Sequence, residues 1–173
     1  MMPRSAAQLR QAFDQAFAEP PRARQGPSVD LLAISICGDA YALPLGEIAG
    51  LFADKQPTPL PTAVPAFLGL AGLGSGVVPV YDLRALLGYA GGGAPRWLVV
   101  LAARPVALAF DGFDGHLRLA QARIAAPERS GARPHVRGLA QDRDALRTIL
   151  DLASVLGAIE QLANGAISPS PPE

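Results

Sequence analysis

Hydrophobic and polar residues alternate in short runs along most of this chain, and an alternation with a period of two is typical of half-buried β-strands. The first run predicts a strand over residues 30–37 with an apolar inward face. That face is formed by Leu32, Ile34 and Ile36. A turn at Gly38 and Asp39 then leads to a returning strand over residues 41–45. The pattern therefore predicts that a β-hairpin opens the folded region.

Residues 69–84 carry the strongest local signal, which is a strand, a glycine turn, a second strand and a short helix. The β-branched residues that favour the second strand are Val77, Val78 and Val80. The turn between the strands is expected to be tight because it holds Gly72, Gly74 and Gly76. Asp82 is placed to cap the N-terminus of a helix over residues 83–87, and Gly88 is placed to end it.

Further apolar runs predict strands in the second half of the chain. We expect them at residues 96–102, 105–111, 116–120, 136–140 and 146–152. The expected connections are a proline-rich loop over 54–65, a glycine-rich break over 88–95 and a polar surface loop over 121–134. A closing helix is expected over residues 153–162, with Asn164 and Gly165 as its cap. Many short strands and few helices predict a mainly β protein.

The two ends of the chain differ from its middle. Residues 5–18 place apolar side chains at helical spacing, which predicts an amphipathic helix that either packs on the domain or docks on a partner. The spaced positions are Leu9, Ala12, Phe13, Ala16 and Phe17. We expect residues 1–28 to form this helix and a linker, residues 29–163 to form the domain, and residues 164–173 to be a disordered tail.

The composition argues against several classes of function. Fifteen basic and fifteen acidic residues give a formal net charge of zero, so there is no electrostatic case for binding nucleic acid or an anionic membrane. Cys37 is the only cysteine, which excludes an intrachain disulfide and favours a cytoplasmic location. No run of residues has the length of a signal peptide or a membrane span, so we expect no direct insertion into a membrane.

Few polar residues are arranged for chemistry. His116 and His135 lie in different segments without partners at metal-ligand spacing, and we interpret them as exposed hairpin residues. Asp111 and Asp114 are interpreted as turn residues, and Cys37 as a small core residue at the end of a strand. The sequence therefore predicts no catalytic residue, no metal site and no cofactor, which favours a binding module over an enzyme.

Two motifs resemble those of CheW-like domains. Residues 38–44, Gly-Asp-Ala-Tyr-Ala-Leu-Pro, resemble the Gly-x-x-Tyr-x-Leu-Pro hairpin of that family, and residues 77–84, Val-Val-Pro-Val-Tyr-Asp-Leu-Arg, resemble its central signature. The resemblance covers residues 30–163. It implies two small five-stranded β-barrel subdomains with short helices, to which the N-terminal and C-terminal helices are added.

The resemblance also implies a function. CheW-like adaptors are non-enzymatic scaffolds of chemotaxis and related signalling, and they couple receptors to a histidine kinase. The implied partners are the regulatory domain of a CheA-like kinase and the cytoplasmic tip of a chemoreceptor. The residues themselves leave a second possibility open, which is a divergent β-barrel that binds a small ligand or associates with itself.

The chain departs from the family at the face that is implied to meet partners. Gly50 stands where an acidic residue is usual, and Gly74 stands where arginine is usual. Either the usual receptor or kinase contact is lost or changed, or the turn simply tolerates glycine. The candidate contact positions, beside a groove expected between the barrels, are Ile48, Gly50, Leu73, Gly74, Val77 and Val78. If Leu73 is exposed, Leu73→Arg should disrupt binding without unfolding, and if it unfolds the protein, the position belongs to the core.

Overall fold

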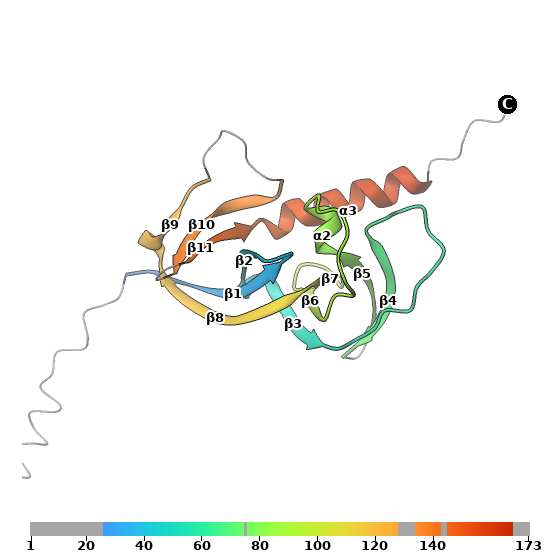
Figure 1. Ribbon diagram of the computed structural model, residues 1–173, viewed down its shortest axis with the longest axis horizontal. Coiled ribbons are helices and arrows are strands. Elements are labelled where there is room, and N and C mark those ends of the chain that lie inside the picture. The colour runs from blue at the N-terminus through green and yellow to red at the C-terminus, as the bar shows by residue number, and fades with distance from the viewer. Residues whose placement is uncertain (1–25, 75, 128–133, 143–144, 168–173) are drawn as a thin grey trace, which may run out of the picture.

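The computed structural model describes residues 26–74, 76–127, 134–142 and 145–167, and its strands form two sheets (Figure 1). The first sheet has six strands in the order β8-β1-β2-β11-β10-β9. These strands are β1 (Ser28–Ile36), β2 (Asp39–Pro44), β8 (Gly112–Ala120), β9 (Ile124–Ala125), β10 (Val136–Asp142) and β11 (Ala145–Leu150). Neighbours are antiparallel except β2 and β11, which pair in parallel and join the two ends of the folded region.

The second sheet has five strands in the order β3-β6-β7-β5-β4. They are β3 (Ile48–Ala53), β4 (Phe67–Leu73), β5 (Gly76–Asp82), β6 (Trp97–Leu101) and β7 (Ala107–Phe110). The helical elements are η1 (Leu45–Glu47), α2 (Leu83–Leu86), η2 (Gln121–Arg123) and α3 (Leu152–Ile167). The expected mainly β architecture is confirmed. The first sheet has a sixth strand because two residues of the predicted loop over 121–134 pair with β10 as β9.

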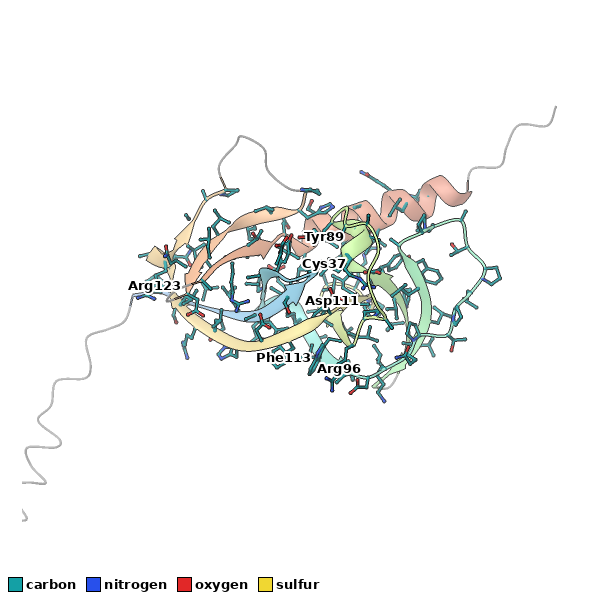
Figure 2. The ribbon with its side chains drawn as sticks, viewed as in Figure 1. Cys37, Tyr89, Arg96, Asp111, Phe113 and Arg123 are labelled. Carbon is teal, nitrogen blue, oxygen red and sulfur yellow. The ribbon has the colours of Figure 1, made fainter. Side chains whose placement is uncertain are left out.

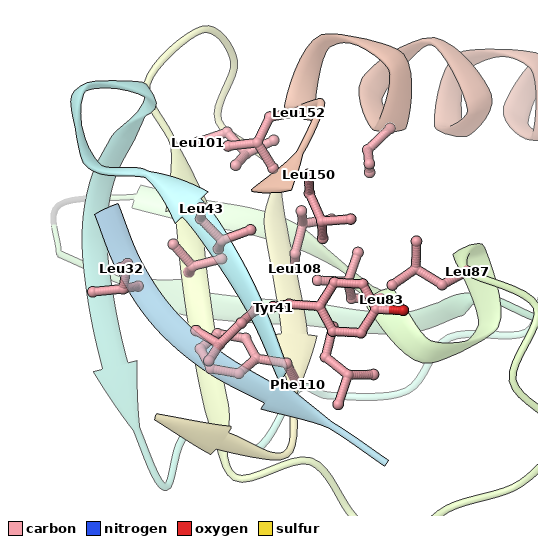
Figure 3. Close-up of a cluster of buried hydrophobic side chains, with 14 of the residues drawn as sticks. Leu32, Tyr41, Leu43, Leu83, Leu87, Leu101, Leu108, Phe110, Leu150 and Leu152 are labelled. Carbon is pink, nitrogen blue, oxygen red and sulfur yellow. The ribbon is translucent and has the colours of Figure 1, made fainter. Parts of the chain in front are cut away.

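One hydrophobic cluster joins the two sheets (Figure 3). The first sheet contributes side chains from β1, β2 and β11, and the second contributes side chains from β6 and β7, while α2 and α3 cover the remaining sides. The buried members labelled in the figure are Leu32, Tyr41, Leu43, Leu83, Leu87, Leu101, Leu108, Phe110, Leu150 and Leu152. Two smaller clusters lie within the second and the first sheet. The two subdomains therefore share their main core and do not meet only at their rims.

The proline-rich loop before β4 is held against that strand. Thr58 pairs with Leu70 through two backbone hydrogen bonds of 2.7 and 2.9 Å. Gly69 makes this close approach possible because it has a φ of +126°, and a Cβ at this position would lie 2.0 Å from the carbonyl oxygen of Thr58. A side chain at position 69 is therefore incompatible with both the backbone conformation and the loop contact.

Cys37 is not a core residue, so that expectation is wrong. Strand β1 ends at Ile36, and the chain reverses through Cys37 and Gly38, whose φ angles are +51° and +86°. Two consecutive residues with positive φ are typical of the tight turn that matches the twist of a hairpin. This geometry places the turn one residue earlier than predicted and leaves Cys37 exposed.

The C-terminal helix is longer than predicted. The carboxylate of Asp151 accepts hydrogen bonds from the backbone N–H groups of Ala153 and Ser154, so it caps the helix at its N-terminus. Helix α3 then continues through Asn164 and Gly165, where an end was expected. Neither residue has the positive φ that ends a helix at a glycine cap. The predicted N-terminal helix and the last six residues of the predicted tail lie outside the described residues.

Among the described residues, no helix combines the length and the apolar character that a membrane crossing requires.

Candidate partner-binding surface

A buried arginine at the start of α2 connects several segments at the junction of the two sheets. The side chain of Arg84 is only 6% exposed, and its guanidinium contacts both carboxylate oxygens of Asp82 at 2.8 to 3.2 Å. The local sequence explains this pairing. Asp82 also accepts the backbone N–H of Arg84 at 2.9 Å, so one carboxylate caps the one-turn helix and holds the arginine two residues later.

The same guanidinium reaches beyond its own helix. Its Nη1 donates to Asp111 at 3.1 Å and to the carbonyl oxygen of Gly93. The other carboxylate oxygen of Asp111 accepts the backbone N–H of Cys37 at 2.8 Å, in the β1–β2 turn of the first sheet. Figure 2 shows Asp111 and Cys37 near each other at this junction. Through Asp111, Arg84 therefore links the second sheet to the first.

Two observations show how tightly this network is built. Gly92 passes directly over the guanidinium, and a Cβ there would lie 2.2 Å from Nη1 of Arg84. The hydrogen bond with Asp82, supported by the charges of Asp82 and Asp111, raises the pKa of Arg84 although burial alone would lower it. The arginine is therefore a permanent cation that holds the junction together. Sequence reasoning did not assign this role to Arg84, although an Asp-x-Arg pair at a helix start is a usable signal.

Tyrosine hydroxyls form a second polar link at the junction. Tyr89 donates to Asp39 at 2.5 Å, and its oxygen lies 2.8 Å from the hydroxyl of Tyr41. Tyr89 belongs to the glycine-rich segment after α2, whereas Asp39 and Tyr41 belong to β2. These bonds fix that segment against the first sheet, so the two sheets are connected by polar contacts as well as by the shared core.

A hollow of about 450 Å³ opens between the two subdomains, as the resemblance led us to expect of a groove there. Its apolar floor includes Leu101 of β6 and Leu152 of α3, which are buried, and the partly exposed Leu156 of α3. The whole lining consists of Gly46, Glu47, Leu101, Ala102, Ala103, Arg137, Leu152, Ala153 and Leu156. The hollow therefore combines an apolar floor with one acidic and one basic side chain.

Glu47 and Arg137 pair across this hollow. The Nη1 of Arg137 on β10 lies 2.5 Å from the Oε1 of Glu47 on η1, and its Nη2 lies 3.6 Å from Asp151, which precedes α3. The hydrogen bond with Glu47 raises the pKa of Arg137 against the effect of burial. Because both partners are more than a third exposed, the pair contributes little to stability and remains accessible to a partner's polar groups.

The predicted contact positions do not form one surface. Ile48 and Gly50 lie on β3, at one edge of the second sheet, and the other four lie on the β4–β5 hairpin at the opposite edge. Ile48 is half-buried and packs against the central cluster. Gly74 is exposed at the hairpin turn with a φ of +59°, and Val77 is 69% exposed. Of the hairpin positions, these two are therefore accessible to a partner.

Leu73 and Val78 must be removed from the contact set. Each is only 6% exposed, because both side chains point into the cluster of the second sheet together with Ala71 and Val80. Successive residues of a strand face opposite sides of the sheet, so Gly72, next to Leu73 on β4, and Val77, next to Val78 on β5, face outward.

The two glycines that replace the charges have different surroundings. A Cβ at Gly50 would lie 2.9 Å from the ring of Phe52, so an acidic residue there would require this ring to move. A Cβ at Gly74 would meet no atom within 4 Å, and only the positive φ disfavours a side chain. An acidic residue at position 50 is therefore opposed by a side-chain contact, and an arginine at position 74 is opposed by the backbone conformation.

The histidines lie apart from one another. His116 on β8 contacts Asp30 at 2.9 Å, and His135 contacts Ser154 at 2.7 Å. Within the ranges that the structure describes, no three His, Cys, Asp or Glu side chains lie close enough to hold a metal ion.

Comparisons with known proteins agree with this fold. The family model of the CheW-like domain matches residues 30–160. The scaffolding protein TtCheW from Thermoanaerobacter tengcongensis has a similar solved structure, with a TM-score of 0.66 and 18% sequence identity over 72% of this chain and 89% of that chain. No curated protein matches the sequence. Because the family model covers most of the chain, this protein belongs to the CheW-like domain family.

Proposed function

We propose that this protein is a non-enzymatic adaptor that couples chemoreceptors to a CheA-type histidine kinase in the cytoplasm. Membership of the CheW-like family supports the class of function, and the hollow between the two subdomains is the observation that carries the proposal further. An apolar floor beside a charged pair is the chemistry that recognises one face of an amphipathic helix.

In this proposal the receptor binds at the hollow. Its walls come from η1, β6, β10 and α3, so both subdomains must hold their relative positions for it to exist. The Arg84 network and the shared core supply that rigidity. A partner helix would place apolar side chains on the partly exposed Leu156 and on Ala102 and Ala103, and polar groups near Glu47 and Arg137.

The kinase contact is proposed to be altered. The β4–β5 turn carries Gly74 instead of the charged residue usual in the family, and Gly50 removes the acidic position. Because Gly50 on β3 and Gly74 lie at opposite edges of the second sheet, each site has lost its own charge, and a contact at the β4–β5 turn is expected to depend little on salt.

Titration calorimetry with a receptor cytoplasmic fragment from the same cell tests the proposal. Ala153→Glu places a bulky charge in the hollow, and position 153 is exposed in the first turn of α3, where an acidic residue is compatible with the helix. Ala85→Glu, at an exposed position on α2 outside the hollow, is the matched control.

We expect the wild type and Ala85→Glu to bind the fragment equally and Ala153→Glu to bind at least about tenfold more weakly, which corresponds to about 1.4 kcal/mol. Equal affinity for all three proteins would show that the hollow is not the receptor site. No binding by any of them would contradict the receptor-coupling function itself.

A further inference from the structure

The outward face of the β4–β5 hairpin is an uncharged surface. Residues 56–81 contain no acidic, basic or histidine residue, although charged residues make up 17% of the chain. The inward side chains of the hairpin fill the core of the second sheet, so its outward positions are those that remain free of that cluster. The outward pairs across the two strands are Gly72 with Val77 and Leu70 with Pro79.

In the first of these pairs, the side chain of Val77 projects from the face and Gly72 opposite it has no side chain. Val77 is 69% exposed, the highest exposure among the exposed large hydrophobic side chains of the described residues. Gly72, directly opposite on β4, has nothing within 4 Å of the place where a Cβ would stand, and its φ is not in the left-handed range. The fold therefore does not require glycine here. What glycine provides is an open position next to Val77 where another surface can approach closely.

This arrangement is self-complementary. Consider a two-fold axis that runs parallel to the strands, midway between β4 and β5 and just outside the face. Rotation about this axis lays β4 of each copy over β5 of the other copy. It places Val77 of each copy on Gly72 of the other. The same axis places Leu70 of each copy on Pro79 of the other, which is again a contact between apolar groups.

We propose that this face is an isologous interface at which two copies of the chain associate, with each Val77 seated on the partner's Gly72. The absence of charge favours a second copy, because no like charges oppose each other across the axis, and the formal net charge of the chain is zero. The small patch predicts a weak, concentration-dependent dimer. None of the residues that line the hollow lies on β4 or β5, so the dimer leaves that site open.

Sedimentation equilibrium over a wide concentration range tests the association. We expect a monomer–dimer equilibrium for the wild type, and at least about a tenfold weaker one for Val77→Asp and for Gly72→Val, which fills the open position. Leu146→Asp, at another exposed apolar position on β11, is the control and should dimerise like the wild type. Circular dichroism verifies that each variant is folded.

Disulfide trapping tests the geometry. In a Cys37→Ser background, a mixture of Val77→Cys and Gly72→Cys chains should crosslink between chains faster than either variant does alone, because the axis brings position 77 of one copy to position 72 of the other. A wild type that stays monomeric at every concentration overturns the proposal, as does equal self-crosslinking of Val77→Cys. If Val77→Asp instead weakens only binding of the kinase regulatory domain, the face belongs to that partner, and the dimer is refuted.

Discussion

Replacing Arg84 by methionine would remove the guanidinium that links the two sheets and would leave most of its surroundings unchanged. Methionine has a similar length and keeps the backbone N–H that Asp82 caps, so the start of α2 is retained. What is lost is the set of side-chain bonds to Asp82, to Asp111 and to the carbonyl oxygen of Gly93.

The size of the effect follows from burial. Asp82 is 14% exposed and would remain as a carboxylate without its cation, whereas Asp111 is 33% exposed and can be rehydrated. Removing one partner of a buried ion pair costs about 3–5 kcal/mol, and the exposure of Asp111 places the expected loss near the lower end, at about 3 kcal/mol. This is a large part of the roughly 5–15 kcal/mol that stabilises a domain of this size.

Urea denaturation followed by the fluorescence of Trp97 measures this loss. Trp97 is the only tryptophan, and its ring on β6 lies 5.2 Å from that of Phe113 on β8, so its emission reports contact between the sheets. We expect the midpoint to fall by about 1.5 M with an unchanged slope, taking a slope of about 2 kcal/mol per molar. Arg104→Met, which breaks an exposed pair with Glu160, is the control and should shift stability by less than about 0.5 kcal/mol.

A partial rescue sharpens this test. Asp82→Asn in the Arg84→Met background removes the stranded charge, so the double variant should be more stable than Arg84→Met alone. If Arg84→Met costs no more than Arg104→Met, the network does not hold the junction, and the reasoning about Arg84 is refuted.

Three further predictions concern Gly69, Leu73 and Tyr81. Gly69→Ala should lower the free energy of unfolding by more than about 2 kcal/mol in urea denaturation, because its Cβ would overlap the carbonyl oxygen of Thr58; a smaller loss would show that the proline loop can move away. Leu73→Arg should abolish the cooperative thermal transition seen by circular dichroism, because it places a charge in the core of the second sheet, and a folded variant would show that Leu73 is accessible after all. Burial raises the pKa of Tyr81 in the folded state, so the neutral phenol favours the folded state. This contribution to the free energy of unfolding is complete below pH 10 and is lost as the pH rises through the folded-state pKa. Tyr81→Phe should therefore reduce the loss of stability above pH 10, and an unchanged pH profile would contradict this.

The strands were largely predictable from the sequence, because period-two alternation records which residues face the core. Leu32, Ile34 and Ile36 were assigned to one face, and all three are buried in the cluster that joins the sheets. The helix cap at Asp82 was also predictable, because its oxygen bonds to a backbone group only two residues away. Interactions that are local in sequence therefore gave reliable predictions.

The errors arise where long-range contacts decide the outcome. Cys37 looks like the last residue of an apolar strand, but the hairpin places it in a left-handed turn. Leu73 and Val78 adjoin the glycine turn, but the strand alternation turns them inward and leaves Gly72 and Val77 outside. Which face of a hairpin meets the core is determined by the rest of the sheet, which a local pattern does not contain.

The candidate site was less predictable than the fold. The hollow is lined by residues from four separate elements, so no local motif marks it. The ion pair between Glu47 and Arg137 joins residues ninety positions apart in the sequence. The bonds of Arg84 to Gly93 and Asp111 likewise exist only after the sheets have packed together. The family resemblance indicated the class of function, and only the structure shows which residues line the hollow.

Reconstitution of the kinase reaction tests the coupling function most directly. Autophosphorylation of the CheA-type kinase of the same cell would be measured with a receptor fragment alone, with this protein added, and with Ala153→Glu or Ala85→Glu in its place. We expect receptor control of the kinase to appear only when the wild type or Ala85→Glu is present and to be lost with Ala153→Glu. Kinase activity that responds to the receptor equally with and without this protein would contradict it.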